Sequence, residues 1–189
     1  YYLPDLILPK NITASASLQE ALAFSDTIGQ AIPMLFLRQT LSHALSYDTL
    51  PRYWFMLTKG IEQSTALLPT QLLQELWVRE REGEEAPFLA VVSGPSFARE
   101  LVEQRSTAVM VAAAPHDKQW IQELSLLLSN DYFHCSPSDD LIGVQLTGAL
   151  KNVIALMMGI IKGAGGGDNT RAWLLTNALQ EMAAIARAY

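Results

Sequence analysis

The sequence predicts an α/β fold in which the back part of a doubly wound parallel sheet is followed by the start of an all-α domain. Short β-rich runs alternate with segments of helical periodicity up to Pro137, which is typical of a parallel sheet covered by helices on both faces. After Ser138 no further strand can be recognised, and two long helical segments follow. We therefore divide the chain into two parts, residues 1–137 and residues 138–189.

Apolar runs that stop at turn-forming residues predict the strands. The run 27–32 stops at Pro33, and the run 53–57 stops at Thr58. Three more strands are predicted by the apolar runs 88–92, 107–112 and 132–135.

Apolar residues three or four positions apart predict the helices between these strands. The charged stretch 79–85 is expected to form a solvated turn, and Asp168 is the expected N-cap of the last helix. The predicted helices are 18–24, 35–45, 67–77, one that opens at 94–98, 117–128, 139–162 and 169–188.

Composition excludes several classes of function. The 189 residues are 50% hydrophobic, which is enough for a core, and the net charge is -6 without a cluster of Lys or Arg. Nonspecific nucleic-acid binding is therefore not expected. The single cysteine, Cys135, excludes an internal disulfide framework and a cysteine-rich metal site, so a reducing compartment is the default expectation. The three histidines lie in unrelated segments without metal-ligand spacing, so we expect no metal site.

The segment 141–161 is long enough to cross a bilayer, but it carries Gln145, Thr147, Lys151 and Asn152 near its middle. We therefore expect no membrane span. The first residues contain no basic leader followed by an apolar core, so no secretory signal is expected. Both ends of the sequence look cut.

Lys151 is the only charged residue between Asp140 and Lys162. Burying an ammonium in an apolar helix is costly unless its pKa falls, an anion pairs with it, or a cavity lies beside it. A lysine that snorkels from a half-buried helix to water is the structural alternative. Because apolar residues surround Lys151 in the sequence, this alternative requires a narrow polar stripe, and we favour a functional lysine.

Two further candidates follow predicted strands. Lys59 lies in Thr58-Lys59-Gly60, at the carboxyl end of a strand, where open α/β sheets bind their ligands. The turn 93–96 follows the next strand, and its glycine, hydroxyl and helix-start amides could receive an anion. The structural alternatives are a solvated lysine and a plain turn capped by Ser96. The glycine run 163–167 is expected to be a helix-to-helix turn and not a phosphate loop, because it follows a helix.

Three sequence blocks occur in an order that resembles one enzyme family, the NAD(P)-dependent glycerol-3-phosphate dehydrogenases. The resemblance covers nearly the whole chain. Weaker matches are Tyr2-Leu3-Pro4 with Leu8-Pro9, the strand that ends at Pro33, and Gly167-Asp168-Asn169 with Arg171-Ala172. The three main blocks are Thr58-Lys59-Gly60-Ile61-Glu62, Ser93-Gly94-Pro95-Ser96-Phe97-Ala98, and Gly148-Ala149-Leu150-Lys151-Asn152-Val153-Ile154-Ala155.

The resemblance implies a Rossmann-type, partial dinucleotide-binding domain in residues 1–137 and the start of a helical catalytic domain in residues 138–189. It implies interconversion of dihydroxyacetone phosphate and sn-glycerol 3-phosphate with NAD or NADP, in the cytoplasm, feeding glycerophospholipid synthesis, and a possible homodimer. It implies that Lys151 is the catalytic lysine, which exchanges a proton with the C2 oxygen. The other implied contacts are Lys59 with cofactor and substrate, Gly94 and Ser96 with substrate, Ala98 and Pro33 with cofactor, and Asn152 as a neighbour of the lysine.

This chemistry agrees with the physical interpretation of Lys151. Ketone reduction needs an acid beside the developing alkoxide, and an ammonium in a dry site supplies both the proton and electrostatic stabilisation. Burial lowers a lysine pKa towards the working pH, and a substrate phosphate would raise it again.

The sequence also departs from the family pattern. Met34 and Leu35 stand where a polar pair is usual, and Gln145 stands where a glutamate is common. The glycine-rich βα turn is expected upstream of Tyr1, and the Gly-Leu-Gly-Asp and Ser-Arg-Asn type segments are expected beyond Tyr189. We therefore expect the isolated chain to be inactive and not to bind the cofactor. Two alternatives stay open: another two-domain hydroxy-acid dehydrogenase, and a truncated, non-catalytic relative that acts as a binding module.

Overall fold

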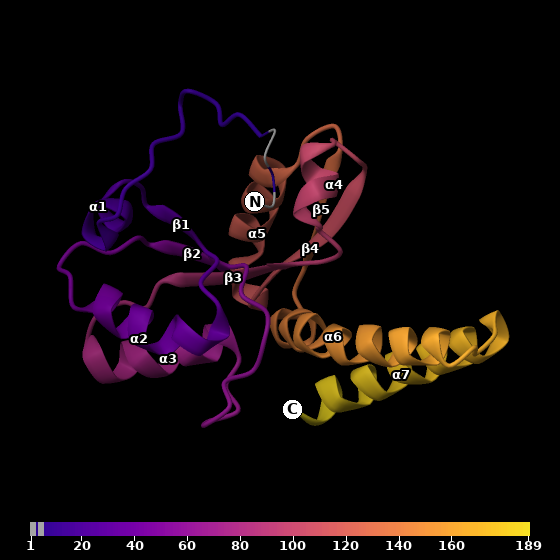
Figure 1. Ribbon diagram of the computed structural model, residues 1–189. Helices are drawn as coiled ribbons and strands as arrows, with labels where there is room; N and C mark the ends of the chain where they lie inside the picture. Colours follow the sequence, from indigo (N-terminus) through magenta and orange to yellow (C-terminus); the bar gives the residue numbers. More distant parts are fainter. Residues whose placement is uncertain (1–2, 4–5) are drawn as a thin grey trace.

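A five-stranded sheet forms the centre of the computed structural model, which describes residue 3 and residues 6–189 (Figure 1). The matches at Tyr2 and Pro4 lie outside the described residues. The strands lie side by side in chain order: β1 (Thr27–Gln30), β2 (Tyr53–Met56), β3 (Phe88–Ser93), β4 (Thr107–Ala113) and β5 (Phe133–Ser138).

The sheet is mixed, which corrects one detail of the prediction. β1, β2 and β3 run parallel, as do β4 and β5, but β3 and β4 pair antiparallel, with Ser93 opposite Met110. The connection 94–106 contains only the five-residue helix α4 (Ala98–Val102). A parallel pairing needs a crossover over one face of the sheet, usually by a full helix, whereas this short connection turns back beside β3. The α/β class and the succession of strands and helices are as predicted.

Helices cover both faces of the sheet, because successive strand residues point to opposite sides. In β3, Leu89 and Val91 belong to a core with α1 (Leu18–Ala23), α2 (Met34–Leu45) and α3 (Pro69–Glu80). Ala90 and Val92 belong to a second core with α5 (Lys118–Leu128), which follows a short 3-10 helix at Pro115–Asp117. β3 is therefore buried on both sides, which is the reason for its uninterrupted apolar sequence.

Beyond β5 the chain forms a hairpin of two long helices, α6 (Leu141–Gly163) and α7 (Asp168–Ala188), that projects from the sheet (Figure 1). The glycine run is a helix-to-helix turn, as predicted: Gly166 N donates to Ile161 O at 2.8 Å, and Gly165 adopts φ +80°. α6 is long and apolar enough to cross a membrane by length and composition, which alone is weak evidence. The division of the chain between residues 137 and 138 stays a prediction.

The expected N-cap of the last helix, Asp168, is wrong, and so is the cap that the structural alternative for residues 93–96 assigned to Ser96. The N-cap of α7 is Gly167, and Asp168 instead lies in the first turn, where it forms an ion pair with Arg171. The N-cap of α4 is Phe97 and not Ser96, and no side chain caps that helix. An acidic residue in the first turn of a helix still interacts favourably with the helix dipole, so sequence alone does not separate these adjacent positions.

Candidate functional site

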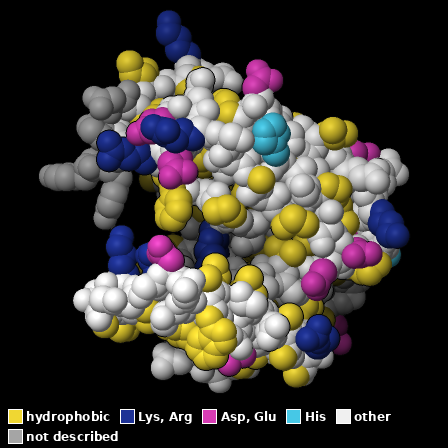
Figure 2. All heavy atoms as spheres, turned by 90° about the vertical axis from the view of Figure 1, so that its right-hand side faces the viewer, with side chains coloured by type: hydrophobic (Ala, Val, Ile, Leu, Met, Phe, Trp, Pro, Cys, Tyr) yellow, Lys and Arg dark blue, Asp and Glu magenta, His cyan; other side chains and the backbone are white. Residues whose placement is uncertain are grey.

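The structure brings Lys151 to the carboxyl end of β3. α6 contacts β3 and β4, and the partly buried Lys151 Nζ donates a hydrogen bond to the Gly94 carbonyl oxygen at 3.0 Å. The two residues are 57 positions apart in the chain. Figure 2 shows a hollow between the projecting helical hairpin and the part of the molecule above it, with a basic side chain inside. The lysine therefore points back to the sheet and does not snorkel along its own helix.

Burial lowers the pKa of the Lys151 ammonium below its ordinary value, and the positive charge of Lys59 lowers it further. Lys59 lies just beyond β2, so the carboxyl ends of two neighbouring parallel strands meet the helical hairpin here. Two ammonium groups at one edge of a sheet create a site suited to a small anion.

The close approach of α6 to this edge depends on Gly148. A Cβ atom at Gly148 would lie 2.6 Å from Ser93 Oγ and 4.0 Å from Lys59 Cγ. Gly148 precedes Lys151 by about one turn of α6, so the stem of Lys59 lies over the same part of the helix. The small residue that the sequence places before Lys151 therefore allows the helix to contact both strand ends.

Three other predicted residues, Pro33, Ser96 and Ala98, follow the carboxyl ends of β1 and β3 in the chain. Ser96 is half-buried in the turn after Gly94, Ala98 is exposed at the start of α4, and Pro33 is the exposed N-cap of α2 beyond β1. Among residues 3 and 6–189, the hydrogen bond of Lys151 goes to Gly94 and not to these three residues. Asn152 is exposed on α6. Their ligand contacts stay predictions.

Sequence reasoning gave no role to Thr58, which is buried beside Lys59. Its hydroxyl lies 2.5 Å from the Ile32 carbonyl oxygen and 2.9 Å from Gln30 Oε1. These contacts tie the end of β2 to the end of β1. The signal was present in the sequence, since a threonine directly after an apolar strand is a candidate for such a bond.

Gln145 joins α6 to the start of α3 through its buried side-chain amide. Its Oε1 accepts from Thr70 N at 3.1 Å, and its Nε2 donates to Thr70 Oγ1 at 2.8 Å and to Leu141 O at 3.0 Å. Thr70 N lies in the first turn of α3, where backbone N–H groups lack intrahelical acceptors. A glutamate at this position would accept the bond from Thr70 N, but its carboxylate could not donate to Thr70 Oγ1 or Leu141 O.

We expect Gln145→Leu to lower the free energy of unfolding by about 2–4 kcal/mol, because it leaves buried polar groups of Thr70 without partners. Urea denaturation measures this loss. Gln74→Leu is the matched control, since Gln74 is exposed on α3 and should change stability by less than about 0.5 kcal/mol. Gln145→Glu should fall between the two. Equal effects of the two leucine substitutions would show that the amide is not a tether.

A cavity of about 610 Å³ lies beside the ends of β1 and β2. Its lining includes Met34 and Leu35, the pair that departs from the family pattern, with residues 61–64. The fit to a nicotinamide cofactor is partial: the apolar side chains suit a flat ring, but no Gly-x-Gly-x-x-Gly turn for a pyrophosphate occurs in the 189 residues.

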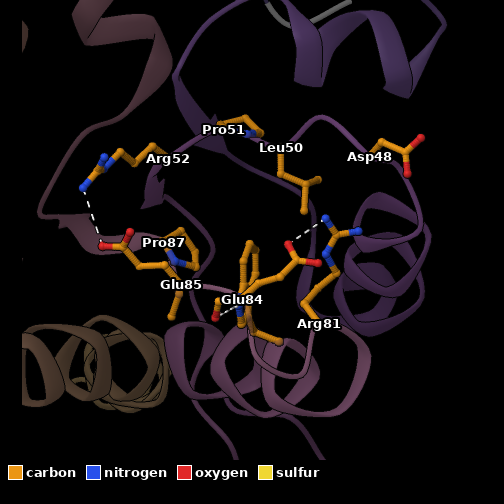
Figure 3. A pocket seen from close by; sticks show the side chains of 10 residues that line it. Asp48, Leu50, Pro51, Arg52, Arg81, Glu84, Glu85 and Pro87 are labelled. Atoms are coloured by element: carbon orange, nitrogen blue, oxygen red, sulfur yellow. Dashed lines mark hydrogen bonds and ion pairs between the residues drawn. The ribbon is translucent and has the colours of Figure 1, made fainter.

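Another cavity, of about 390 Å³, is unrelated to Lys151 (Figure 3). It lies at the amino ends of β2 and β3. Arg52, which precedes β2, and Pro87, which precedes β3, both line it. Arg81 lines it too, bound to Glu84 at 2.8 Å. Ligands of open α/β sheets bind at the carboxyl ends of the strands, so we place the candidate site at Lys151.

Comparison with known proteins identifies relatives over nearly the whole chain. A family model described as the N-terminus of NAD-dependent glycerol-3-phosphate dehydrogenase matches residues 1–119, and one described as its C-terminus matches residues 140–189. The chain is 37% identical over 184 residues to glycerol-3-phosphate dehydrogenase [NAD(P)+] of Staphylococcus carnosus, covering 97% of this chain and 54% of the relative. The Alcanivorax borkumensis protein of the same name is 37% identical over 185 residues, covering 98% and 51%.

Solved structures agree with these sequence matches. The crystal structure of glycerol-3-phosphate dehydrogenase from Coxiella burnetii superposes with a TM-score of 0.84 at 29% identity, covering 99% of this chain and 55% of that one. The structure of the Saccharomyces cerevisiae enzyme gives a TM-score of 0.78 at 25% identity, covering 100% and 54%. The chain thus spans about half the length of the curated relatives it matches.

Proposed function

Because the chain belongs to the NAD-dependent glycerol-3-phosphate dehydrogenase family, we propose that it acts in the interconversion of dihydroxyacetone phosphate and sn-glycerol 3-phosphate with NAD or NADP. The observation that carries the proposal is the hydrogen bond from Lys151 Nζ to the Gly94 carbonyl oxygen, beside Lys59. This contact supports the proposal because it holds an ammonium group of lowered pKa at the carboxyl ends of the strands, where open α/β sheets bind their ligands.

In the proposed reaction, a hydride would be supplied to C2 of the ketone by NADH or NADPH when it is bound. Lys151 donates a proton from Nζ to the C2 oxygen, so that the ketone becomes a secondary alcohol, and Nζ then regains a proton from solvent. In the reverse direction the neutral amine accepts that proton. The Gly94 carbonyl oxygen orients the ammonium, and the nearby charge of Lys59 favours the phosphorylated substrate electrostatically.

A substrate panel tests this function on the protein expressed from its whole gene. We expect oxidation of NADH or NADPH with dihydroxyacetone phosphate, at least about 100-fold faster than with unphosphorylated 2-keto acids, because a phosphate group carries more negative charge than a carboxylate and is attracted more strongly by the ammonium groups of Lys59 and Lys151. Absorbance of the reduced nicotinamide measures the rate. Preference for a 2-keto acid would favour another hydroxy-acid dehydrogenase, and binding without turnover would favour a non-catalytic binding module.

Several finer statements belong to the same proposal. Ser96 is proposed to contact substrate, and Ala98 and Pro33 are proposed to contact cofactor, since each lies at the strand-end edge that holds Lys151. Cytoplasmic location, a role in glycerophospholipid synthesis and a homodimer stay predictions from the family. The preference between NADH and NADPH is left to the same assay.

A further inference from the structure

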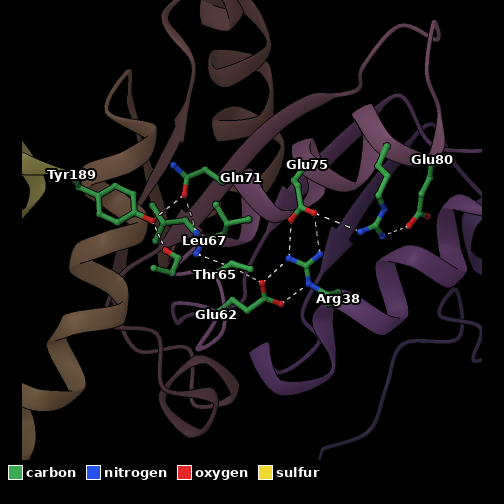
Figure 4. A network of polar contacts seen from close by, with 11 residues as sticks. Arg38, Glu62, Thr65, Leu67, Gln71, Glu75, Glu80 and Tyr189 are labelled. Atoms are coloured by element: carbon green, nitrogen blue, oxygen red, sulfur yellow. Dashed lines mark hydrogen bonds and ion pairs between the residues drawn. The ribbon is translucent and has the colours of Figure 1, made fainter.

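The loop between β2 and α3, residues 57–68, carries Lys59 and is attached to its surroundings along its length. Near its start, Gly60 adopts φ +140°, and an added Cβ would lie 3.2 Å from Met34 Cβ. Near its end, the Ala66 carbonyl oxygen accepts from the hydroxyl of Tyr189, the residue that follows α7, at 2.5 Å (Figure 4). We call residues 57–68 the Lys59 loop.

Glu62 is the central attachment of the Lys59 loop. Its carboxylate accepts two hydrogen bonds from Arg38 of α2, at 2.8 Å from Nε and 2.7 Å from Nη2, and another from the Thr65 hydroxyl (Figure 4). Its backbone closes the inner turn of the loop: Ala66 N donates to Glu62 O at 2.8 Å, and Glu62 N donates to Leu67 O at 2.9 Å. Glu62 thus connects the Lys59 loop, which its backbone closes, to α2, which its side chain binds.

The ion pair of Glu62 and Arg38 is well shielded. The Glu62 side chain is only 12% exposed, and the hydrogen bonds from Arg38 lower the pKa of its carboxyl. A two-pronged contact between a guanidinium and a carboxylate is among the stronger and more directional polar interactions. It therefore fixes the orientation of the loop. The long, flexible side chain of Lys59 cannot provide this on its own.

Arg38 also binds a second carboxylate, Glu75 of α3, at 2.7 Å from Nη2 and 3.2 Å from Nη1 (Figure 4). Glu75 is 40% exposed and lies outside the Lys59 loop. The same guanidinium therefore has one partner on the loop and one on a packed helix. Removing either carboxylate makes the same change in charge beside Arg38, but only Glu62 holds the loop.

We propose that Arg38 and Glu62 are positioning residues for Lys59, which fix the Lys59 loop on α2 and thereby hold the Lys59 ammonium near Lys151. The inference deepens the proposed function, since it rests on the assignment of both lysines to one site. The stem of Lys59 lies over Gly148, about one turn before Lys151, so the position of the loop sets the distance between the two ammonium groups.

The test compares Glu62→Gln with Glu75→Gln in the protein expressed from its whole gene. Hydrogen exchange measures the opening of the loop at the amide of Ala66, and NMR titration of the lysine Cε and Nζ groups measures the pKa of Lys151. We expect exchange at Ala66 to be about tenfold faster in Glu62→Gln and unchanged in Glu75→Gln. We also expect the pKa of Lys151 to rise in Glu62→Gln only.

The sign of the titration separates positioning from simple charge removal. Neutralising a carboxylate makes its surroundings more positive, which lowers the pKa of a nearby lysine. The Lys59 ammonium lowers the pKa of Lys151, so a loosened loop weakens this repulsion and raises that pKa. A rise in Glu62→Gln alone would therefore support the proposal, and a fall or equal behaviour of the two variants would overturn it.

Arg38→Lys gives an independent version of the test. It keeps the positive charge but lacks the two-pronged geometry, so it should reproduce the faster exchange and raised pKa of Glu62→Gln. If Glu62→Gln does not fold, Arg38→Lys decides the question alone by the same two measurements, and wild-type values would overturn the proposal. Because neither measurement needs turnover, absence of dehydrogenase activity would contradict the proposed function while leaving this result standing.

Discussion

Replacing Lys151 by methionine is expected to lower kcat for reduction of dihydroxyacetone phosphate by about 10²- to 10⁴-fold, the usual contribution of a positioned acid or base. Methionine has nearly the length of lysine but no proton to donate to the C2 oxygen. Steady-state kinetics of the protein expressed from its whole gene measure the loss. Lys151→Arg should be similarly impaired, because a guanidinium keeps the charge but does not deprotonate in the working range.

Lys162→Met is the matched control, because Lys162 is an exposed lysine in the last turn of the same helix. It should leave kcat unchanged within a factor of about two. If Lys151→Met kept the wild-type kcat while folded, the catalytic assignment would be wrong. If both variants lost activity equally, the effect would belong to the stability of α6 and not to the chemistry of Lys151.

The free energy of unfolding should depend on pH differently in the wild type and in Lys151→Met. The pKa of Lys151 in the folded protein lies below its ordinary value of 10.5. Between the lowered pKa and 10.5 the unfolded chain binds more protons than the folded one, so the free energy of unfolding of the wild type rises with pH. Lys151→Met lacks this dependence. Its stability relative to the wild type should therefore be greatest at low pH and should shrink as pH rises through this interval.

The parts of the site that the sequence predicted have local signals. Lys151 is a single charge in an apolar helix, and Lys59 and Gly94 each follow an apolar run that ends at a turn. The direction of β4 has no such signal, since an apolar run reads the same for either direction of pairing. It follows from how the short connection 94–106 returns to the sheet.

Contacts between distant residues were the main part that the sequence did not predict. Gln145 and Thr70 are 75 positions apart, and Arg38 and Glu62 are 24 apart. In the sequence each residue looks like an ordinary polar side chain. Only the folded chain shows the hydrogen-bond partner that offsets the energetic cost of its burial. The departure at Gln145 was visible in the sequence, but its effect could be judged only once Thr70 was seen beside it.

Replacing Gly94 by alanine is the second change with a large expected effect, because it disturbs both the sheet and the acceptor of Lys151. An added Cβ would lie 2.8 Å from Val109 Cα and 2.9 Å from the Ala108 carbonyl oxygen. These are backbone atoms of β4, so relief requires the end of β3 to separate from β4. We expect a loss of about 2–3 kcal/mol in the free energy of unfolding, measured by urea denaturation.

Gly159→Ala gives the opposite sign from the same chemical change, which makes it the sharpest control for Gly94→Ala. Gly159 lies inside α6, and an added Cβ would meet nothing within 4 Å. Alanine there should raise the free energy of unfolding by about 0.5–1 kcal/mol, since glycine is a poor helix former. If Gly94→Ala were as harmless as Gly159→Ala, β3 and β4 would not be in close contact at this point. The position of the carbonyl group that holds Lys151 would then need another explanation.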